Sequence, residues 1–493
     1  MAICTGVSFP IATIMNIEAL LLHHFPYEPT AGQSELISRL AIFFANPITP
    51  GTRRLFIIRG YAGTGKTTVV TTLVQSLPLL GKQTVLLAPT GRAAKVLTAY
   101  TGQRAFTIHK KIYLPSTNKD GSMYLRLSPN RHKNTIFIVD EASMIQKSQN
   151  AILATSLFAS RDVLDDLIEY IFSGFNCSLM FIGDIAQLPP VGMTISPALD
   201  PRYLRSSYDL EIGGYELKDV VRQSLESGIL ANATMLRSKI SGNDPTMPFF
   251  NLSGFDDIKS INGTELTDLL ETCYSKYGRE EVAVITRSNK RANLFNQQIR
   301  SRILYRENEI EAGDLMMVVK NNYAWLSADS KTSFIANGDI IEIKRLRNVE
   351  EMYGFHFAEA YIRLIDYPDE PELEVKLLLD TITSESPSLT SEDNRRLFNA
   401  IMEDYADIPQ RRKRIENVKK NPYYCALEVK FAYAYTCHKT QGGQWQAVFV
   451  EQGFLKPEGI NTEFMRWLYT AVTRATEQLY LVNFNKDFFT EDK

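Results

Sequence analysis

The segment 55–68, LFIIRGYAGTGKTT, carries residue types that can bind a nucleoside triphosphate. Its centre fits G-x-x-x-x-G-K-[ST], a glycine-rich loop whose backbone N–H groups point at phosphate oxygens. We expect Lys66 to reach the β- and γ-phosphates and the Thr67 hydroxyl to ligate Mg²⁺. The residues predicted to hold ATP here are Gly60, Tyr61, Ala62, Gly63, Thr64, Gly65, Lys66, Thr67 and Thr68. An apolar strand before the loop and a helix after it favour phosphate binding over a plain glycine-rich turn.

Two carboxylates follow another apolar run, Ile136 to Val139. We expect Asp140 to hold the Mg²⁺ bound to Thr67, and Glu141 to polarise the water that attacks the γ-phosphate. A buried acidic pair without such a role would be costly. A further strand, 179–182, ends in the polar loop 183–191, where Gln187 is predicted to sense the nucleotide; a loop ended by two prolines is the alternative.

Other segments could bind a nucleobase or a polynucleotide strand. Gln33 lies in the first turn of a helix capped by Thr30, where its amide can offer a donor and an acceptor to a base edge. An exposed helix glutamine is the alternative. The strand 84–88 ends in Pro89-Thr90-Gly91-Arg92, a turn that could cradle a phosphodiester backbone or could be an ordinary strand-to-helix connection.

A basic hairpin is predicted between residues 110 and 133. Asp120-Gly121 is a strong turn signal between two alternating segments. The segment opposes one acid, Asp120, with six bases: Lys110, Lys111, Lys119, Arg126, Arg131 and Lys133. Such charge indicates either a nucleic-acid contact or a solvated face.

Bulk composition limits the possible classes of protein. A chain of 493 residues is expected to hold two to four domains. Its net charge of −2 confines any nucleic-acid site to a local groove. The five cysteines form no C-x-x-C pair, and no apolar run could span a bilayer, so we expect a cytoplasmic protein without membrane contact. Residues 1–14 are expected to be a poorly ordered extension.

The motifs together carry a family resemblance. GYAGTGKTT, APTGRAAK, TIHK, VDEASM, GDIAQLPPVG, HKTQGGQW and YTAVTRAT occur in the order found in superfamily 1 helicases. Their sequences are most similar to those of the RecD/Dda-like branch, whose members move 5′ to 3′. The motifs span residues 29–475.

This resemblance implies an α/β fold with two RecA-like P-loop motor domains. A β-hairpin would be inserted in the first, and a small β-barrel plus a helical subdomain in the second. We expect the first motor domain at 15–225 with the hairpin at about 110–133, and a variable connecting segment at 226–274. The second motor domain is expected at 275–340 and 430–493, with its insert at 341–429.

The resemblance also implies roles for individual residues. Gln33 would read adenine, Gln187 would sense the γ-phosphate, and Gly442 would lie near the nucleotide. Arg222 and Arg474 would reach the γ-phosphate across a cleft and complete the catalytic set with Lys66, Asp140, Glu141 and Gln187. The residues expected to contact nucleic acid are Pro89, Thr90, Gly91, Arg92, His109, Asn289, His438, Lys439 and Thr440.

The predicted function is therefore ATP-dependent 5′-to-3′ movement along single-stranded DNA and unwinding of duplexes, with Mg²⁺ as cofactor. The expected partners are single-stranded and tailed duplex DNA, and the expected processes are DNA repair and recombination. A monomer is favoured, and the 341–429 insert could bind protein partners. An RNA-directed helicase and a nucleic-acid-stimulated ATPase switch without unwinding remain the alternatives.

Overall fold

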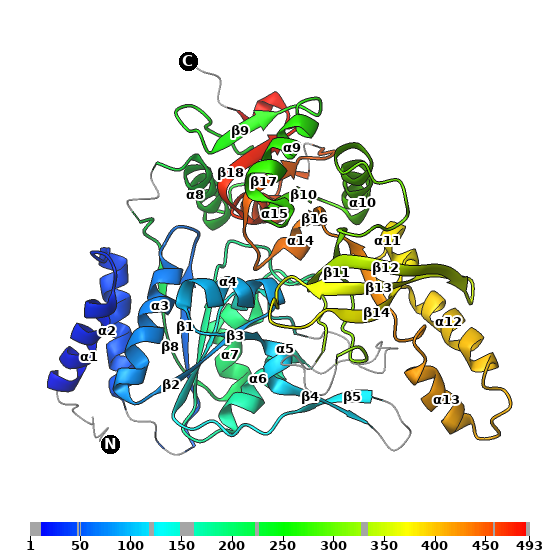
Figure 1. The fold of residues 1–493 in the computed structure, drawn as a ribbon. Coiled ribbons are helices and arrows are strands. Elements are labelled where there is room, and N and C mark those ends of the chain that lie inside the picture. The colour runs from blue at the N-terminus through cyan, green and yellow to red at the C-terminus, as the bar shows by residue number, and fades with distance from the viewer. Residues whose placement is uncertain are drawn as a thin grey trace.

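The computed structural model describes residues 11–46, 49, 51–117, 123–147, 162–221, 226–326, 334–456 and 459–489. Its strands form two parallel sheets, a closed barrel and a two-stranded hairpin (Figure 1). None of the helices in these ranges is long and apolar enough to cross a membrane.

The first sheet has six parallel strands in the order β3-β2-β6-β7-β1-β8. They are β1 (Arg54–Gly60), β2 (Gln83–Ala88), β3 (Ala105–Thr107), β6 (Thr135–Val139), β7 (Ser178–Gly183) and β8 (Glu211–Leu217). The central strands are buried on both faces, as their continuous apolar runs require. Because all six run in parallel, the loops after β1, β6 and β7 meet at one edge of the sheet.

Seven helices within the described ranges cover this sheet. α1 (Ile11–His24), α2 (Ala31–Ala45), α3 (Lys66–Ser76) and α4 (Gly91–Thr101) contribute to the apolar core on one face. α5 (Ile108–Ile112), α6 (Val163–Phe172) and α7 (Pro201–Tyr208) contribute to the core on the other. The predicted hairpin is present as β4 (Tyr113–Thr117) and β5 (Met123–Leu127).

The predicted extension at residues 1–14 is wrong at its C-terminal end. α1 begins at Ile11, and Ile14 packs against the same core as Ile17 and Leu21. Those three side chains recur at helical spacing, so the apolar stripe extends upstream of Met15. Residues 1–10 lie outside the described part of the chain.

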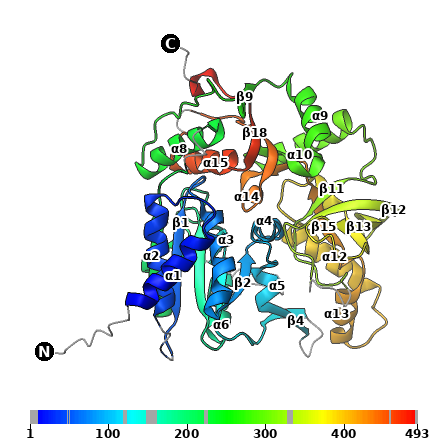
Figure 2. The same cartoon turned by 60° about the vertical axis from the view of Figure 1, so that its left-hand side comes forward.

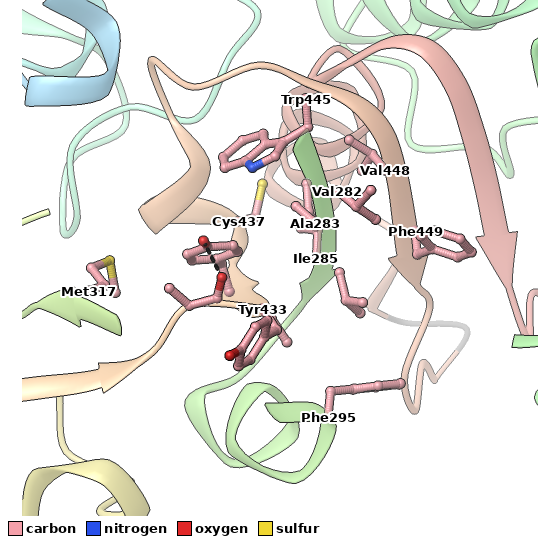
Figure 3. Close-up of a cluster of buried hydrophobic side chains, with 14 of the residues drawn as sticks. Val282, Ala283, Ile285, Phe295, Met317, Tyr433, Cys437, Trp445, Val448 and Phe449 are labelled. Atoms are coloured by element: carbon pink, nitrogen blue, oxygen red, sulfur yellow. Dashed lines mark hydrogen bonds between the residues drawn. The ribbon is translucent and has the colours of Figure 1, made fainter. Parts of the chain in front are cut away.

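The second sheet has five parallel strands in the order β16-β10-β17-β18-β9. They are β9 (Ile258–Ile261), β10 (Val282–Thr286), β16 (Ala434–Thr436), β17 (Trp445–Glu451) and β18 (Ala475–Val482). Its helices are α8 (Gly228–Ser241), α9 (Leu266–Tyr277), α10 (Asn289–Gln298), α14 (Cys437–Thr440) and α15 (Thr462–Val472). Figure 3 shows its core, where Val282 and Ile285 of β10 lie near Phe449 of β17.

Two predicted domain boundaries are wrong. Residues 226–274 are not a connecting segment, because α8 packs on α15 and β9 pairs with β18. The barrel does not begin at 341, because β11 (Leu315–Val318) pairs with barrel strands rather than with the second sheet. β9 and β11 have four residues each, too few for periodicity to reveal which sheet they join.

The closed barrel is completed by β12 (Ile340–Met352), β13 (Phe355–Leu364), β14 (Leu373–Leu378) and β15 (Leu427–Phe431). After β14 the chain forms α11 (Asp380–Thr383), α12 (Ser391–Glu403) and α13 (Arg411–Lys420). Leu397 and Ile401 of α12 and Val418 of α13 pack against Phe355 and Phe357 of the barrel. The predicted fold class is confirmed: two P-loop-type α/β domains with an inserted hairpin, and an inserted barrel with helices.

Candidate nucleotide and strand sites at the domain seam

The loop between β1 and α3 has the backbone of a phosphate-binding loop. Gly63 and Gly65 have φ values of 74° and 82°, the left-handed region that favours glycine. The Lys66 ammonium and the Thr64 hydroxyl both donate to the Tyr61 carbonyl, each at 2.8 Å. Lys66 is therefore held across the loop, at the first residue of α3.

Gln33 connects the start of α2 to this loop. Its side-chain carbonyl accepts the Thr30 N–H at 2.9 Å, and its amide donates to the Thr64 carbonyl at 3.2 Å. A Cβ added at Gly65 would lie 2.4 Å from the Gln33 amide nitrogen. Because Gln33 is only 3% exposed, the alternative of an exposed helix glutamine is wrong. Adenine recognition by Gln33 stays a prediction.

Asp140 and Glu141 follow β6 at the same sheet edge. One Asp140 oxygen accepts the Tyr100 hydroxyl at 2.6 Å, and the other accepts the Glu141 N–H at 2.9 Å. Burial raises the pKa of Glu141, while the nearby Arg474 charge opposes that rise. Among the described residues, the buried Glu141 Oε2 has no hydrogen-bond partner. An acceptor oxygen left in this state is suited to polarising a water.

The residues at this edge fit Mg²⁺ by their chemistry. Thr67 is exposed at the start of α3, and Asp140 supplies a carboxylate, so both donors are oxygens. Within the described ranges, no group of three or more His, Cys, Asp or Glu side chains could hold a metal by itself. A site of one hydroxyl and one carboxylate is typical where substrate phosphates complete the magnesium coordination.

Helix α15 of the second domain contacts the loop that follows β7. Arg466 donates to the carbonyls of Ile185 and Gln187, the latter at 3.1 Å. The Thr470 hydroxyl accepts the Leu188 N–H at 2.9 Å. Figure 2 shows α15 along the side of the second domain that faces the first. These bonds place Gln187 at the seam between the two sheets.

Gln187 itself is 5% exposed, and its side-chain oxygen has no hydrogen-bond partner in the part of the chain that is described. Gln441, which follows α14, donates to the adjacent Leu188 carbonyl at 2.6 Å. The loop after β7 is thus fixed through its backbone, while the Gln187 side-chain oxygen can still accept a hydrogen bond.

Arg474 lies just past α15 and is 3% exposed. Its guanidinium donates to the carbonyls of Thr470 and Gly443, both at 3.0 Å, and approaches Glu141 Oε1 to 4.0 Å. The structure thus brings together two of the predicted catalytic residues from different domains. Arg222 lies outside the described residues, but Val221 just before it donates to the Gly63 carbonyl at 2.9 Å.

Four contacts made by three tyrosines at this site were not predicted from the sequence. The Tyr469 hydroxyl contacts both Ala62 and Asp184, and the Tyr100 hydroxyl contacts Asp140. Arg237 of α8 lies over the Tyr61 ring, 4.6 Å from its centroid. The sequence held one signal: Arg466, Tyr469 and Thr470 share one helix face, a polar stripe on an otherwise apolar helix.

Thr90 and Arg92, two of the residues predicted to contact nucleic acid, also lie at the seam. Thr90 caps α4, and Arg92 donates to the Gln444 carbonyl at 2.8 Å while lying 4.1 Å from the Trp445 ring centroid. A Cβ added at Gly442 would lie 3.2 Å from the Thr90 hydroxyl. Gly442 therefore lies against the Thr90 turn, and its contact with the nucleotide stays a prediction.

The barrel covers this turn. Lys110 of α5 pairs with Asp339 of the barrel at 3.3 Å, with side chains 6% and 0% exposed, and lies 3.7 Å from the Tyr367 ring centroid. A Cβ at Gly91 would lie 2.5 Å from the same Asp339 carboxylate. Burial raises the pKa of the neighbouring Asp366 to about 6, even though Arg92 lies nearby.

The other residues predicted to contact nucleic acid differ in solvent accessibility. Burial lowers the pKa of His109 to about 4, so the imidazole is neutral at pH 7. His438 is exposed, and Lys439 donates to Asn337 of the barrel at 3.0 Å. Asn289 donates to the Glu385 carbonyl at 3.0 Å, and Pro89 is half-buried after β2. Thr440 is fully buried, and its hydroxyl donates to Cys437, so it does not face the surface with the others.

Protein-family models match segments of both domains that form this seam. The AAA domain model matches residues 48–193, and the UvrD-like helicase C-terminal domain model matches residues 431–482. An uncharacterized protein of Acanthamoeba polyphaga mimivirus is 23% identical over 88% of this chain and 96% of its own length. The ATP-dependent DNA helicase dda of Enterobacteria phage T4 is 24% identical over 62% of this chain and 64% of that protein. A solved Pif1 helicase from Bacteroides, in complex with ADP-AlF3 and ssDNA, aligns at 16% identity over 89% of this chain and 91% of that one, with a TM-score of 0.43.

Proposed function

The chain belongs to the superfamily 1 helicases, in the RecD/Dda-like branch of ATP-dependent DNA helicases, and we propose that it moves 5′ to 3′ along single-stranded DNA and unwinds tailed duplexes. The observation that carries this proposal is the hydrogen-bonded seam. α15 of the second domain contacts the phosphate loop and the Gln187 loop of the first, and Arg474 lies 4.0 Å from Glu141.

In the proposed reaction, Lys66 neutralises phosphate charge and Glu141 orients and polarises the attacking water. Arg474, joined by Arg222, stabilises charge that develops on the transferring phosphoryl group. Mg²⁺, held by Thr67 and Asp140, would add further neutralisation of the triphosphate. These groups come from both domains, so the catalytic set is complete only when the cleft is closed.

Movement follows from the coupling of cleft closure to strand contacts. A ligand shifts a two-state equilibrium only through differential contacts with the two states, and groups that reach the γ-phosphate from both domains supply them. Pro89–Arg92 and His109 in the first domain, and Asn289, His438 and Lys439 in the second, would hold the strand alternately. The β4–β5 hairpin would then separate the strands of the duplex.

Two assays test this proposal. ATP hydrolysis is measured with no nucleic acid, with single-stranded DNA and with single-stranded RNA; stimulation by DNA is expected. Unwinding is then measured on 5′-tailed, 3′-tailed and blunt duplexes, and only the 5′-tailed DNA is expected to open. Stimulation by RNA alone would make the protein an RNA-directed motor. Stimulated hydrolysis without unwinding of any duplex would make it an ATPase switch.

A further inference from the structure

Tyr469 places one oxygen atom between three elements of the seam. The side chain projects from α15 and is 1% exposed. Its hydroxyl accepts the Ala62 N–H of the phosphate loop at 2.8 Å and donates to Asp184 Oδ2 at 2.6 Å. The other Asp184 oxygen accepts the Ala186 N–H at 2.8 Å. Tyr469 therefore connects the second domain to the phosphate loop and to the start of the Gln187 loop.

The chemistry of this hydroxyl suits a fixed connection. Burial, together with the Asp184 charge, raises the pKa of Tyr469 well above its usual value, so the phenol stays protonated and always donates to the carboxylate. A hydrogen bond to an ionised carboxylate is stronger than one between neutral groups. Loss of the oxygen would leave Ala62 and a carboxylate that is 1% exposed without these bonds.

We propose that Tyr469 is a positioning residue that couples closure of the two motor domains to ATP hydrolysis. The inference rests on the proposed function. Both bonds of the hydroxyl cross the seam, so they form only when α15 lies against the first domain. They stabilise the closed state relative to any open one, and in that state they fix Ala62 of the phosphate loop and Asp184 at the start of the Gln187 loop.

Simple packing is the alternative role for a buried tyrosine at a domain contact. Tyr469→Phe keeps the ring and removes only the oxygen, so it separates the two roles. The chain offers a matched control in Tyr433, which is 0% exposed and is labelled in Figure 3. Its hydroxyl likewise accepts a backbone N–H, from Leu315 at 3.0 Å, and donates to a carboxylate, Asp314, at 3.1 Å. These bonds join Tyr433 to the start of barrel strand β11 and make no contact with the first domain.

The experiment compares the wild-type chain with its Tyr469→Phe and Tyr433→Phe variants. Five quantities are measured: the kcat and KM of DNA-stimulated ATP hydrolysis, the affinity for ADP, the affinity for ADP with aluminium fluoride, and the Tm. For Tyr469→Phe, kcat and the affinity for the fluoride complex should each fall by about ten-fold, because both depend on the closed state. Its KM and ADP affinity should change by less than about two-fold, because the groups of the first domain remain. Tyr433→Phe should leave both nucleotide affinities at wild-type values.

Two results would overturn the proposal. One is a Tyr469→Phe protein whose kcat and affinity for the fluoride complex match the wild type. The other is an equal loss of affinity for ADP and for its fluoride complex together with a lowered Tm, which would make the residue structural. If DNA does not stimulate the wild type, the proposed function fails on its own, and the two affinities still decide the role of Tyr469.

Discussion

Replacing Arg474 with glutamine should slow ATP hydrolysis and also change its pH dependence. The guanidinium is 3% exposed, is held by the Thr470 and Gly443 carbonyls, and lies 4.0 Å from Glu141. Glutamine removes the positive charge but keeps a polar side chain of moderate length. The change therefore tests the charge that faces the predicted general base and the γ-phosphate position.

The magnitude follows from the separation of the charges. Two unit charges 4.0 Å apart interact by about 4 kcal/mol at an effective dielectric constant of about 20. The two side chains are 3% and 23% exposed, so salt screens them little. If the guanidinium acts on phosphoryl charge at a comparable distance, its loss lowers kcat by about a thousand-fold, at about 1.36 kcal/mol per factor of ten. That value is the low end of the range known for arginine fingers.

The pH dependence has a definite sign. Burial raises the pKa of Glu141 and Arg474 opposes the rise, so loss of Arg474 raises that pKa further. The base is active as a carboxylate, so activity is lost as the pH falls through the Glu141 pKa. The acidic limb of the kcat profile should therefore move to higher pH in Arg474→Gln. Arg474→Lys keeps the charge, so its kcat should fall while the limb stays in place.

The assay is DNA-stimulated ATP hydrolysis from pH 5.5 to 9 at saturating ATP, with single-strand binding as the control for folding. A kcat for Arg474→Gln within about ten-fold of the wild type would show that the charge does not act on the reaction. An acidic limb that moves equally in the glutamine and lysine variants would refute the argument that charge sets the Glu141 pKa.

Three further predictions concern the loop, the hairpin and the barrel. Lys66→Ala should reduce ATP hydrolysis to background while single-strand binding stays within about two-fold, because Lys66 belongs to the phosphate loop and not to the predicted nucleic-acid contacts; an active variant would refute the site. Shortening the hairpin at 113–125 should impair unwinding of tailed duplexes more than single-strand-stimulated hydrolysis, and equal loss of both would remove its role in strand separation. Asp339→Asn should free Lys110, its partner at 3.3 Å, for a DNA phosphate. Single-strand binding would tighten, and its salt dependence would steepen by about one counterion, whereas an unchanged salt slope would contradict this.

The four central strands of the first sheet could be predicted closely because their function and their fold use the same signal, whereas the edge strands β3 and β8 were not predicted. β1, β6 and β7 are apolar runs buried on both faces, and each ends directly in polar residues. In a parallel sheet the carboxyl ends lie together, so Lys66, Asp140 and Gln187 could be assigned to one edge from chain order alone. Gln33 was more ambiguous, because its 3% exposure depends on contacts with a loop distant in the sequence.

The contacts of the second domain could not be derived in this way. Ala62 and Tyr469 are 407 residues apart in the chain, and no periodicity links a helix face to a loop at that distance. Gly442 shows the same limit. Its φ of 72° explains why glycine is needed there, but only the packed domains reveal that it lies beside Thr90. Local patterns specify elements, whereas the partner of an element depends on the arrangement of whole domains.

Helix α4 connects the turn predicted to contact DNA to the predicted nucleotide site of the first domain. Thr90 and Arg92 lie at its N-terminal end, and Tyr100, near its C-terminal end, donates to Asp140 at 2.6 Å. Eleven helical residues span about 16 Å, and a helix of that length moves as a rigid body. A displacement of the Thr90 turn by a bound strand would therefore be transmitted to the carboxylate at the predicted magnesium site. If the proposed function holds, α4 would link the Thr90 turn to Asp140, and α15 would link domain closure to the phosphate loop, so both contacts end on the same sheet edge.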